Sequence, residues 1–226
     1  MKRIAIAILV LLNSLLYAGD VATFANLGFS NDSKYFMFGL YGIIEDGSGQ
    51  YAELHLVDVQ GNRFVPGGSH RASYDQIPDA GQTGFGALVT LFRANIERSD
   101  RYDVNHMESG RLLYLLIDGD EPKSELSFRD FETGRSFEVE LRQSTSGSNE
   151  AVRSAFHINL TVSAGGLEDR FTIGLPDYMR EGVTSYRIRR IYASPDDSAL
   201  VFVIEKFEHA DSGHDIRYMV ETVRVR

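Results

Sequence analysis

The chain contains no cysteine among its 226 residues. This absence excludes disulfide bonds and cysteine catalysis. It also leaves no cysteine that could be lipidated after an export signal, so we expect a protein that is not a lipoprotein. Burial of apolar side chains must therefore stabilise the fold without covalent cross-links.

Basic residues are scarce as well. The formal net charge is −9, and only four residues are lysine. Such a chain repels a polyanion on average, and no cluster of Lys and Arg provides a local exception. Three arginines at positions 187, 189 and 190 come nearest, but they nearly alternate with apolar residues, as on the polar face of a strand. The composition therefore argues against nucleic acid as a partner.

Sequence motifs for nucleophilic or zinc catalysis are missing. The chain has no Gly-x-Ser-x-Gly, no Ser-x-x-Lys and no His-Glu-x-x-His. Paired carboxylates could serve glycoside hydrolysis, but among 32 acidic residues such pairs are unavoidable. We therefore identify no catalytic residue, no cofactor-binding residue and no cofactor from the sequence.

Only one long apolar run occurs, at residues 4–16. Lys2 and Arg3 precede it, and Ala18 ends a segment suited to signal-peptide cleavage. The run is about half the ~20 residues that cross a bilayer, which makes it a poor permanent anchor. This layout predicts a signal peptide at residues 1–18. Residues 19–226 are then expected to form a single β-rich domain, periplasmic or secreted, with no membrane span after cleavage.

Apolar residues beyond this run recur mainly with the period of β-strands, between turns rich in Gly, Asp, Ser and Asn. One segment differs, because Phe85, Leu88, Phe92 and Ile96 have helical spacing and predict an amphipathic helix over 84–99. The fold class is therefore all-β with one inserted helix. Strands are expected at Val21–Leu27, Tyr35–Ile44, Tyr51–Val59, Arg111–Ile117, Glu125–Phe131, Ser136–Arg142, Phe156–Ser163, Arg170–Leu175, Ser185–Ala193, Ala199–Phe207 and Ile216–Val225.

An internal repeat groups these strands into antiparallel β-meanders. Residues 30–38 match residues 194–202 without gaps, each as a Ser-x-Asp turn that opens a strand. Such units resemble propeller blades, and a stack of sheets is the alternative. Adjacent residues of a strand point to opposite faces. Residues 37 and 38 are both apolar, as are residues 201 and 202. The two strands that contain them therefore need apolar cover on both faces.

We accordingly expect Phe38 and Phe202 to be almost fully buried, with the helix packed on a sheet edge. Strands such as Tyr51–Val59 need cover on one side only. The polar residues Glu53, His55 and Glu221 are expected on the uncovered face.

Several segments resemble a family of predicted secreted bacterial proteins, domain of unknown function 2259. They are Gly19–Phe24, Asn26–Ser30, Tyr35–Gly39, Gly110–Tyr114 and Ser194–Asp196. The resemblance runs along the chain after the signal segment. It implies export and a single domain, and it supplies neither an activity nor site residues.

Two segments are candidates for ligand binding. The glycine-rich stretch at residues 81–86 leads into the expected helix, where Gly84 and Gly86 could present amides to an anion. The favoured interpretation is a loop capped by Thr83. His209, Asp211 and His214 could bind zinc or another divalent ion, although a solvated hairpin loop between two strands is the favoured interpretation. A third loop, residues 118–121, is acidic but lacks the remaining ligands of a calcium site.

Two functional hypotheses remain. The first is an exported, non-catalytic binding or envelope-associated protein, which holds an unknown protein or small ligand of the envelope on its loops. The second is a hydrolase that acts on an extracytoplasmic polymer through carboxylates. The missing nucleophile and metal motifs favour the first.

The signal layout makes a direct prediction. Protein recovered from outside the cytoplasm should begin at Gly19, because the apolar run and the cleavage segment place the cut after Ala18. N-terminal sequencing measures this, and a retained Met1 would show that the segment is not a cleaved signal.

Overall fold

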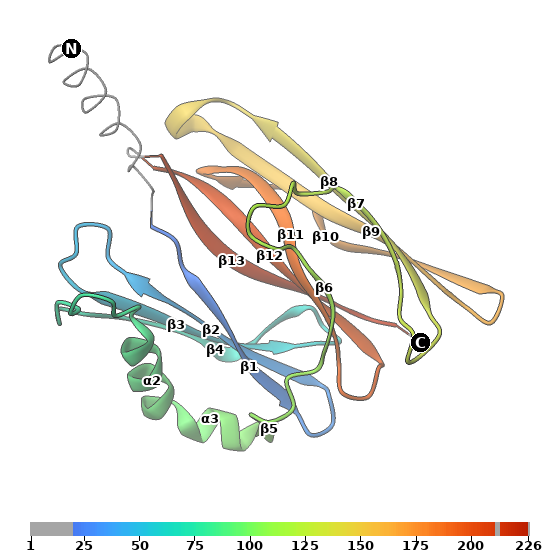
Figure 1. The fold of residues 1–226 in the computed structure, drawn as a ribbon, viewed down its shortest axis with the longest axis horizontal. Helices are drawn as coiled ribbons and strands as arrows, with labels where there is room; N and C mark the ends of the chain where they lie inside the picture. Colours follow the sequence, from blue (N-terminus) through green and yellow to red (C-terminus); the bar gives the residue numbers. More distant parts are fainter. Residues whose placement is uncertain (1–19, 211–212, 226) are drawn as a thin grey trace, which may run out of the picture.

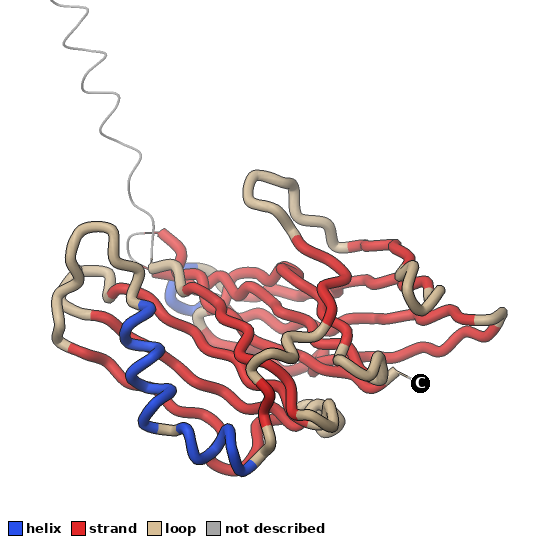
Figure 2. Tube along the Cα trace, turned by 60° about the horizontal axis from the view of Figure 1, so that its bottom comes forward, coloured by secondary structure: helices blue, strands red, loops and turns tan. Residues whose placement is uncertain are grey.

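Residues 20–210 and 213–225 are described by the computed structural model, and antiparallel β-strands dominate them (Figure 1). The strands form three sheets stacked in layers, and two helices lie beneath the first sheet (Figures 1 and 2). We name the sheet next to the helices the helix-covered sheet, the sheet in the middle of the stack the central sheet, and the third the outer sheet.

The helix-covered sheet is a meander of four strands with a short fifth strand at its edge. Its order is β4-β3-β2-β1-β5. Two helices follow β4 in the chain, and α2 packs against β2, β3 and β4. The elements are β1 Thr23–Ser30, β2 Tyr35–Ile43, β3 Gln50–Asp58, β4 Arg63–Tyr74, α2 Phe85–Ala94, α3 Ile96–Arg101 and β5 Val104–Asn105.

The other two sheets each contain four strands. The outer sheet is a pure meander, β10-β9-β8-β7, and the central sheet has the order β13-β12-β11-β6. A 3-10 turn, Asn149–Ala151, precedes β9. The strands are β6 Arg111–Leu115, β7 Glu125–Arg129, β8 Ser136–Ser146, β9 Arg153–Ala164, β10 Leu167–Glu181, β11 Val183–Ala193, β12 Ala199–Ala210 and β13 Gly213–Arg224.

Strand β12 explains why the sheets stack. Its residues 201–204 are all fully buried, at 0% exposure. Val201 and Val203 pack with the helix-covered sheet, whereas Phe202 and Ile204 pack with the outer sheet. The central sheet therefore has apolar cover on both faces, as alternating side chains on a strand require.

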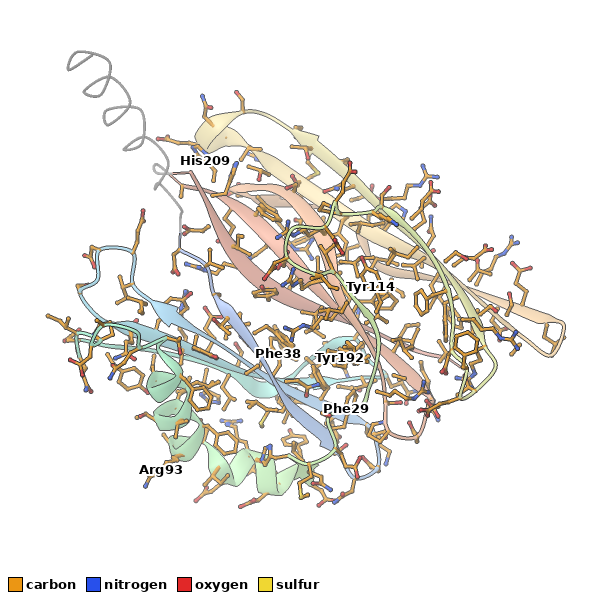
Figure 3. The ribbon with its side chains drawn as sticks, viewed as in Figure 1. Phe29, Phe38, Arg93, Tyr114, Tyr192 and His209 are labelled. Carbon is orange, nitrogen blue, oxygen red and sulfur yellow. The ribbon has the colours of Figure 1, made fainter. Side chains whose placement is uncertain are left out.

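The predicted burial of the two phenylalanines is confirmed. Phe38 is 1% exposed and Phe202 is 0% exposed. Phe38 packs on Phe24 and Phe36 in the cluster that joins the helix-covered and central sheets. Figure 3 shows Phe38 and Tyr192 in the space between these two sheets. The stacked-sheet alternative is correct, since the described residues form neither a closed barrel nor a propeller.

The two Ser-x-Asp turns have the same hydrogen bonds. The Ser30 hydroxyl donates to Asp32 at 2.8 Å, and the Ser194 hydroxyl donates to Asp196 at 2.6 Å. Each serine oxygen also accepts the backbone N–H of the first residue of the next strand, at 2.9 Å in one turn and 3.0 Å in the other. These local bonds determine where β2 and β12 begin.

The helix differs from the sequence prediction in two ways. It covers a face of the sheet instead of an edge, and it ends at Ala94, where Asn95 separates α2 from α3. Leu88 packs so closely over Gly39 that a Cβ there would lie 2.5 Å from the leucine Cδ1. The helix therefore covers the sheet face closely only because residue 39 has no side chain.

Strand β4 was not predicted from the sequence. Residues 66–68 are Pro-Gly-Gly, a combination that normally marks a turn. Here they form an irregularity in the strand, and pairing with β3 continues on both sides of it. Cross-strand hydrogen bonding outweighs the local propensity for a turn.

The two-sided burial of β12 predicts the effect of removing its aromatic ring. Phe202→Ala should lower the free energy of unfolding by about 3–5 kcal/mol, because it leaves a cavity in a closely packed core. Chemical denaturation measures the loss. Phe131→Ala is the matched control, since that ring is 89% exposed. An equal, small effect of both substitutions would contradict the two-sided packing.

Candidate functional site

A cleft of about 660 Å³ opens beside β13, the edge strand of the central sheet. Residues of all three sheets line it: β2, β3 and β4, then β12 and β13, and β10 of the outer sheet. Three other hollows in the described part of the chain are smaller, at about 450, 440 and 70 Å³. A concave site of this kind, with apolar walls and a few polar groups, is where small molecules generally bind.

The apolar wall of the cleft is open to solvent. Phe64 is 51% exposed and Leu175 is 59% exposed, although both are large apolar side chains. Val57, Met219 and Val220 continue the lining. Exposed apolar residues that gather in one concavity indicate a contact surface for a partly apolar ligand.

A line of polar side chains runs across β3 and β4, and its two members on β3, Glu53 and His55, line the cleft. Glu53 and Arg71 face each other across the two strands, as do His55 and Ser69. The His55 Nε2 lies 3.1 Å from Glu53, and the Ser69 Oγ lies 3.0 Å from His55 Nδ1. The guanidinium of Arg71 contacts the other oxygen of Glu53 at 3.0 Å. Successive cross-strand pairs on one face thus produce a continuous line of contacts.

The second acidic group of the cleft is Glu221 on β13. Its side chain is buried, and Asn62 donates a hydrogen bond to it at 2.5 Å. The nearest cation is Arg180, at 4.0 Å. Burial raises the pKa of Glu221 above its ordinary value, and Asn62 and Arg180 offset only part of that effect.

Arg180 is held by aromatic rings at this end of the cleft. Its guanidinium carbon lies 4.9 Å from the centroid of Tyr178 and 5.3 Å from that of Phe156. One guanidinium nitrogen, Nη1, is buried and has no hydrogen-bond partner. Arg180 is therefore a positive group positioned mainly by packing, not by a close ion pair.

The location of three polar residues corrects the sequence prediction. Glu53, His55 and Glu221 were expected on an uncovered face, but all three line the cleft; His55 is 8% and Glu221 is 7% exposed. Residues of the helix-covered and outer sheets line the same cleft as β13 and cover these positions. A single sequence contains no signal for that cover, because it depends on how the sheets stack.

The two candidate metal-binding histidines lie in strands and not in a loop. His209, labelled in Figure 3, faces His214 across the β12–β13 hairpin, one pair before its last paired residues. Asp211 lies outside the described residues. No group of three or more potential metal ligands occurs among the residues that the structure describes. A metal site at this hairpin therefore remains a prediction from the sequence.

The candidate anion site lies at the start of α2. Gly84 is the N-cap residue, with a left-handed φ of 81°, and no side chain caps the helix. The expected cap by Thr83 is therefore wrong. Gly84 and Gly86 line a separate, polar hollow of about 450 Å³. Anion binding there stays a prediction.

Stacked antiparallel sheets with a cleft at the edge of the central sheet define a multilayered all-β protein. A family model described as Predicted secreted protein (DUF2259) matches residues 37–224, so the chain belongs to that family. Comparison with curated proteins gave no match, and comparison with solved structures gave none. In the described part of the chain, no helix has the length and apolarity needed to cross a membrane.

The raised pKa of Glu221 predicts a pH dependence of stability. The folded protein binds this proton more tightly than the unfolded chain, so stability from Glu221 is lost as pH rises from about 4.5 through the folded pKa. Glu221→Gln removes that loss. Its stability relative to the wild type should therefore increase from pH 4 to pH 7.

Denaturant titrations at several pH values measure this difference. Glu138→Gln, on an exposed position of β8, controls for the loss of one negative charge. A Glu221→Gln difference that stays constant, or that falls with rising pH, would contradict the burial effect.

Proposed function

We propose that this is an exported binding protein that holds a small, partly apolar ligand in the cleft beside β13. One observation carries the proposal: large apolar side chains are exposed inside a concavity that also contains charged groups of both signs. An apolar body of the ligand would contact Phe64 and Leu175. Its polar groups would meet Arg180, Glu53 or Glu221.

Export is part of the same proposal. The layout of residues 1–18 supports a cleaved signal peptide, and membership in a family of predicted secreted proteins agrees with it. Residues 19–226 would then act as one domain in the periplasm or outside the cell. The ligand would be a component of that space.

A second candidate is hydrolysis of an extracytoplasmic polymer by two carboxylates. The specific observation in its favour is that two carboxyl groups of the cleft have pKa values shifted in opposite directions. Burial raises the pKa of Glu221, whereas the hydrogen bond with His55 and the charge of Arg71 lower that of Glu53. Such a divergence distinguishes an acid from a base. Both groups are, however, already engaged by neighbouring side chains.

The binding proposal is tested with 8-anilinonaphthalene-1-sulfonate, a fluorescent probe with an apolar body and one anionic group. We expect Phe64→Ala to weaken its binding about tenfold, which corresponds to about 1.4 kcal/mol. Phe131→Ala is the matched control, because Phe131 is exposed but does not line the cleft.

Equal affinities of both variants and the wild type would show that the probe does not use the cleft.

For the second candidate, release of reducing sugar from an envelope polysaccharide is measured with the wild type and with Glu221→Gln. Release that depends on Glu221 would favour hydrolysis over simple binding.

A further inference from the structure

The line of polar side chains on β3 and β4 contains the three groups of a catalytic triad: a hydroxyl, an imidazole and a carboxylate. A serine hydroxyl, Ser69, lies 3.0 Å from one ring nitrogen of His55, and the other ring nitrogen lies 3.1 Å from the Glu53 carboxylate. A nucleophile beside a base that is oriented by a third group is the arrangement of covalent hydrolases. It is recognised by geometry and not by sequence order.

Two phenylalanine rings pack against the imidazole. Its ring centroid lies 4.8 Å from that of Phe38 and 5.1 Å from that of Phe64. The histidine and glutamate side chains are 10% and 16% exposed, whereas Ser69 is exposed. The base and its partner are thus packed inside, and the hydroxyl is accessible beside the cleft.

The hydrogen bonds also determine which nitrogen is basic. The hydrogen bond with His55, followed by the charge of Arg71, lowers the pKa of Glu53, so this group is a carboxylate at neutral pH and can only accept. In the tautomer that satisfies both contacts, Nε2–H donates to Glu53, because the carboxylate has no proton to give. The lone pair of Nδ1 then accepts the hydrogen bond from the Ser69 hydroxyl, which is the direction that a general base requires.

We propose that Ser69 is a nucleophile activated by His55, and that the protein cleaves carboxylic esters with an apolar acyl chain. This activity goes beyond the binding function proposed above and is tested separately from it. The substrate class follows from the neighbouring wall of the cleft, where Phe64 and Leu175 offer apolar contact to an acyl chain. Glu53 is a positioning residue in this scheme.

The reaction balances with water as the second substrate. The Ser69 oxygen forms a bond to the ester carbonyl carbon while its proton moves to His55 Nδ1. The ester C–O bond then breaks, and the alcohol leaves with that proton. Water next attacks the acyl-serine and gives one proton to His55. The carboxylic acid leaves, and the proton returns to the serine oxygen.

The first experiment identifies the nucleophile in the wild-type protein. A fluorophosphonate reacts with activated serines by forming an O–P bond with loss of fluoride. Trypsin releases residues 64–71 as one peptide, in which Ser69 is the sole hydroxyl-bearing residue. We expect the phosphonate on this peptide. Absence of labelling, or labelling only elsewhere, would overturn the proposal.

The second experiment measures hydrolysis of p-nitrophenyl butyrate. Ser69→Ala should lower kcat/KM by at least about 100-fold, whereas Ser73→Ala, an exposed serine of the same strand, should leave it unchanged. Glu53→Gln should lower kcat with little change in KM, because it disturbs the orientation of the base and not the acyl contact. Hydrolysis that persists in Ser69→Ala, or that is absent from the wild type, would refute the assignment.

Discussion

The structure depends on burying both faces of one strand, β12. Residues 201–204 of β12 are apolar and fully buried, so each face of the central sheet must be covered by another sheet. The helix-covered sheet meets the same demand on β2, where Met37 contacts the α2 side and Phe38 contacts the central sheet. Alternation of side chains along a strand thus specifies the order helix, sheet, sheet, sheet.

Polar contacts at the ends of the strands join these layers. Arg111 of β6 forms ion pairs with Asp130, which follows β7, and with Asp197 in the turn before β12. Burial of Asp130 alone would raise its pKa, but the hydrogen bonds from Arg111 and Thr133 hold that pKa at about 2. The carboxylate therefore stays charged and ties the outer sheet to the central sheet at a turn.

The cleft arises where the stack is incomplete. The central sheet ends at β13, and residues of both neighbouring sheets line a space beside this edge. Asn62 satisfies part of the exposed edge, since its side chain accepts the backbone N–H of Thr222 at 2.7 Å and donates to Glu221. The polar side chains at this edge strand are therefore partly buried in the cleft and not exposed to water. Their burial and their contacts with one another shift their pKa values.

Local pattern in the sequence determined the strand content, the two Ser-x-Asp turns and the burial of Phe38 and Phe202, because each depends on neighbours within a few residues. The length and placement of the helix were less well determined, since they depend on contacts such as Leu88 over Gly39. Strand β4 depended on pairing with β3, which outweighs its Pro-Gly-Gly segment. The cleft and the Ser69–His55–Glu53 line were decided by tertiary structure alone: they require a particular register of β3 against β4 and the overlap of three sheets, and neither is encoded in any short stretch of chain.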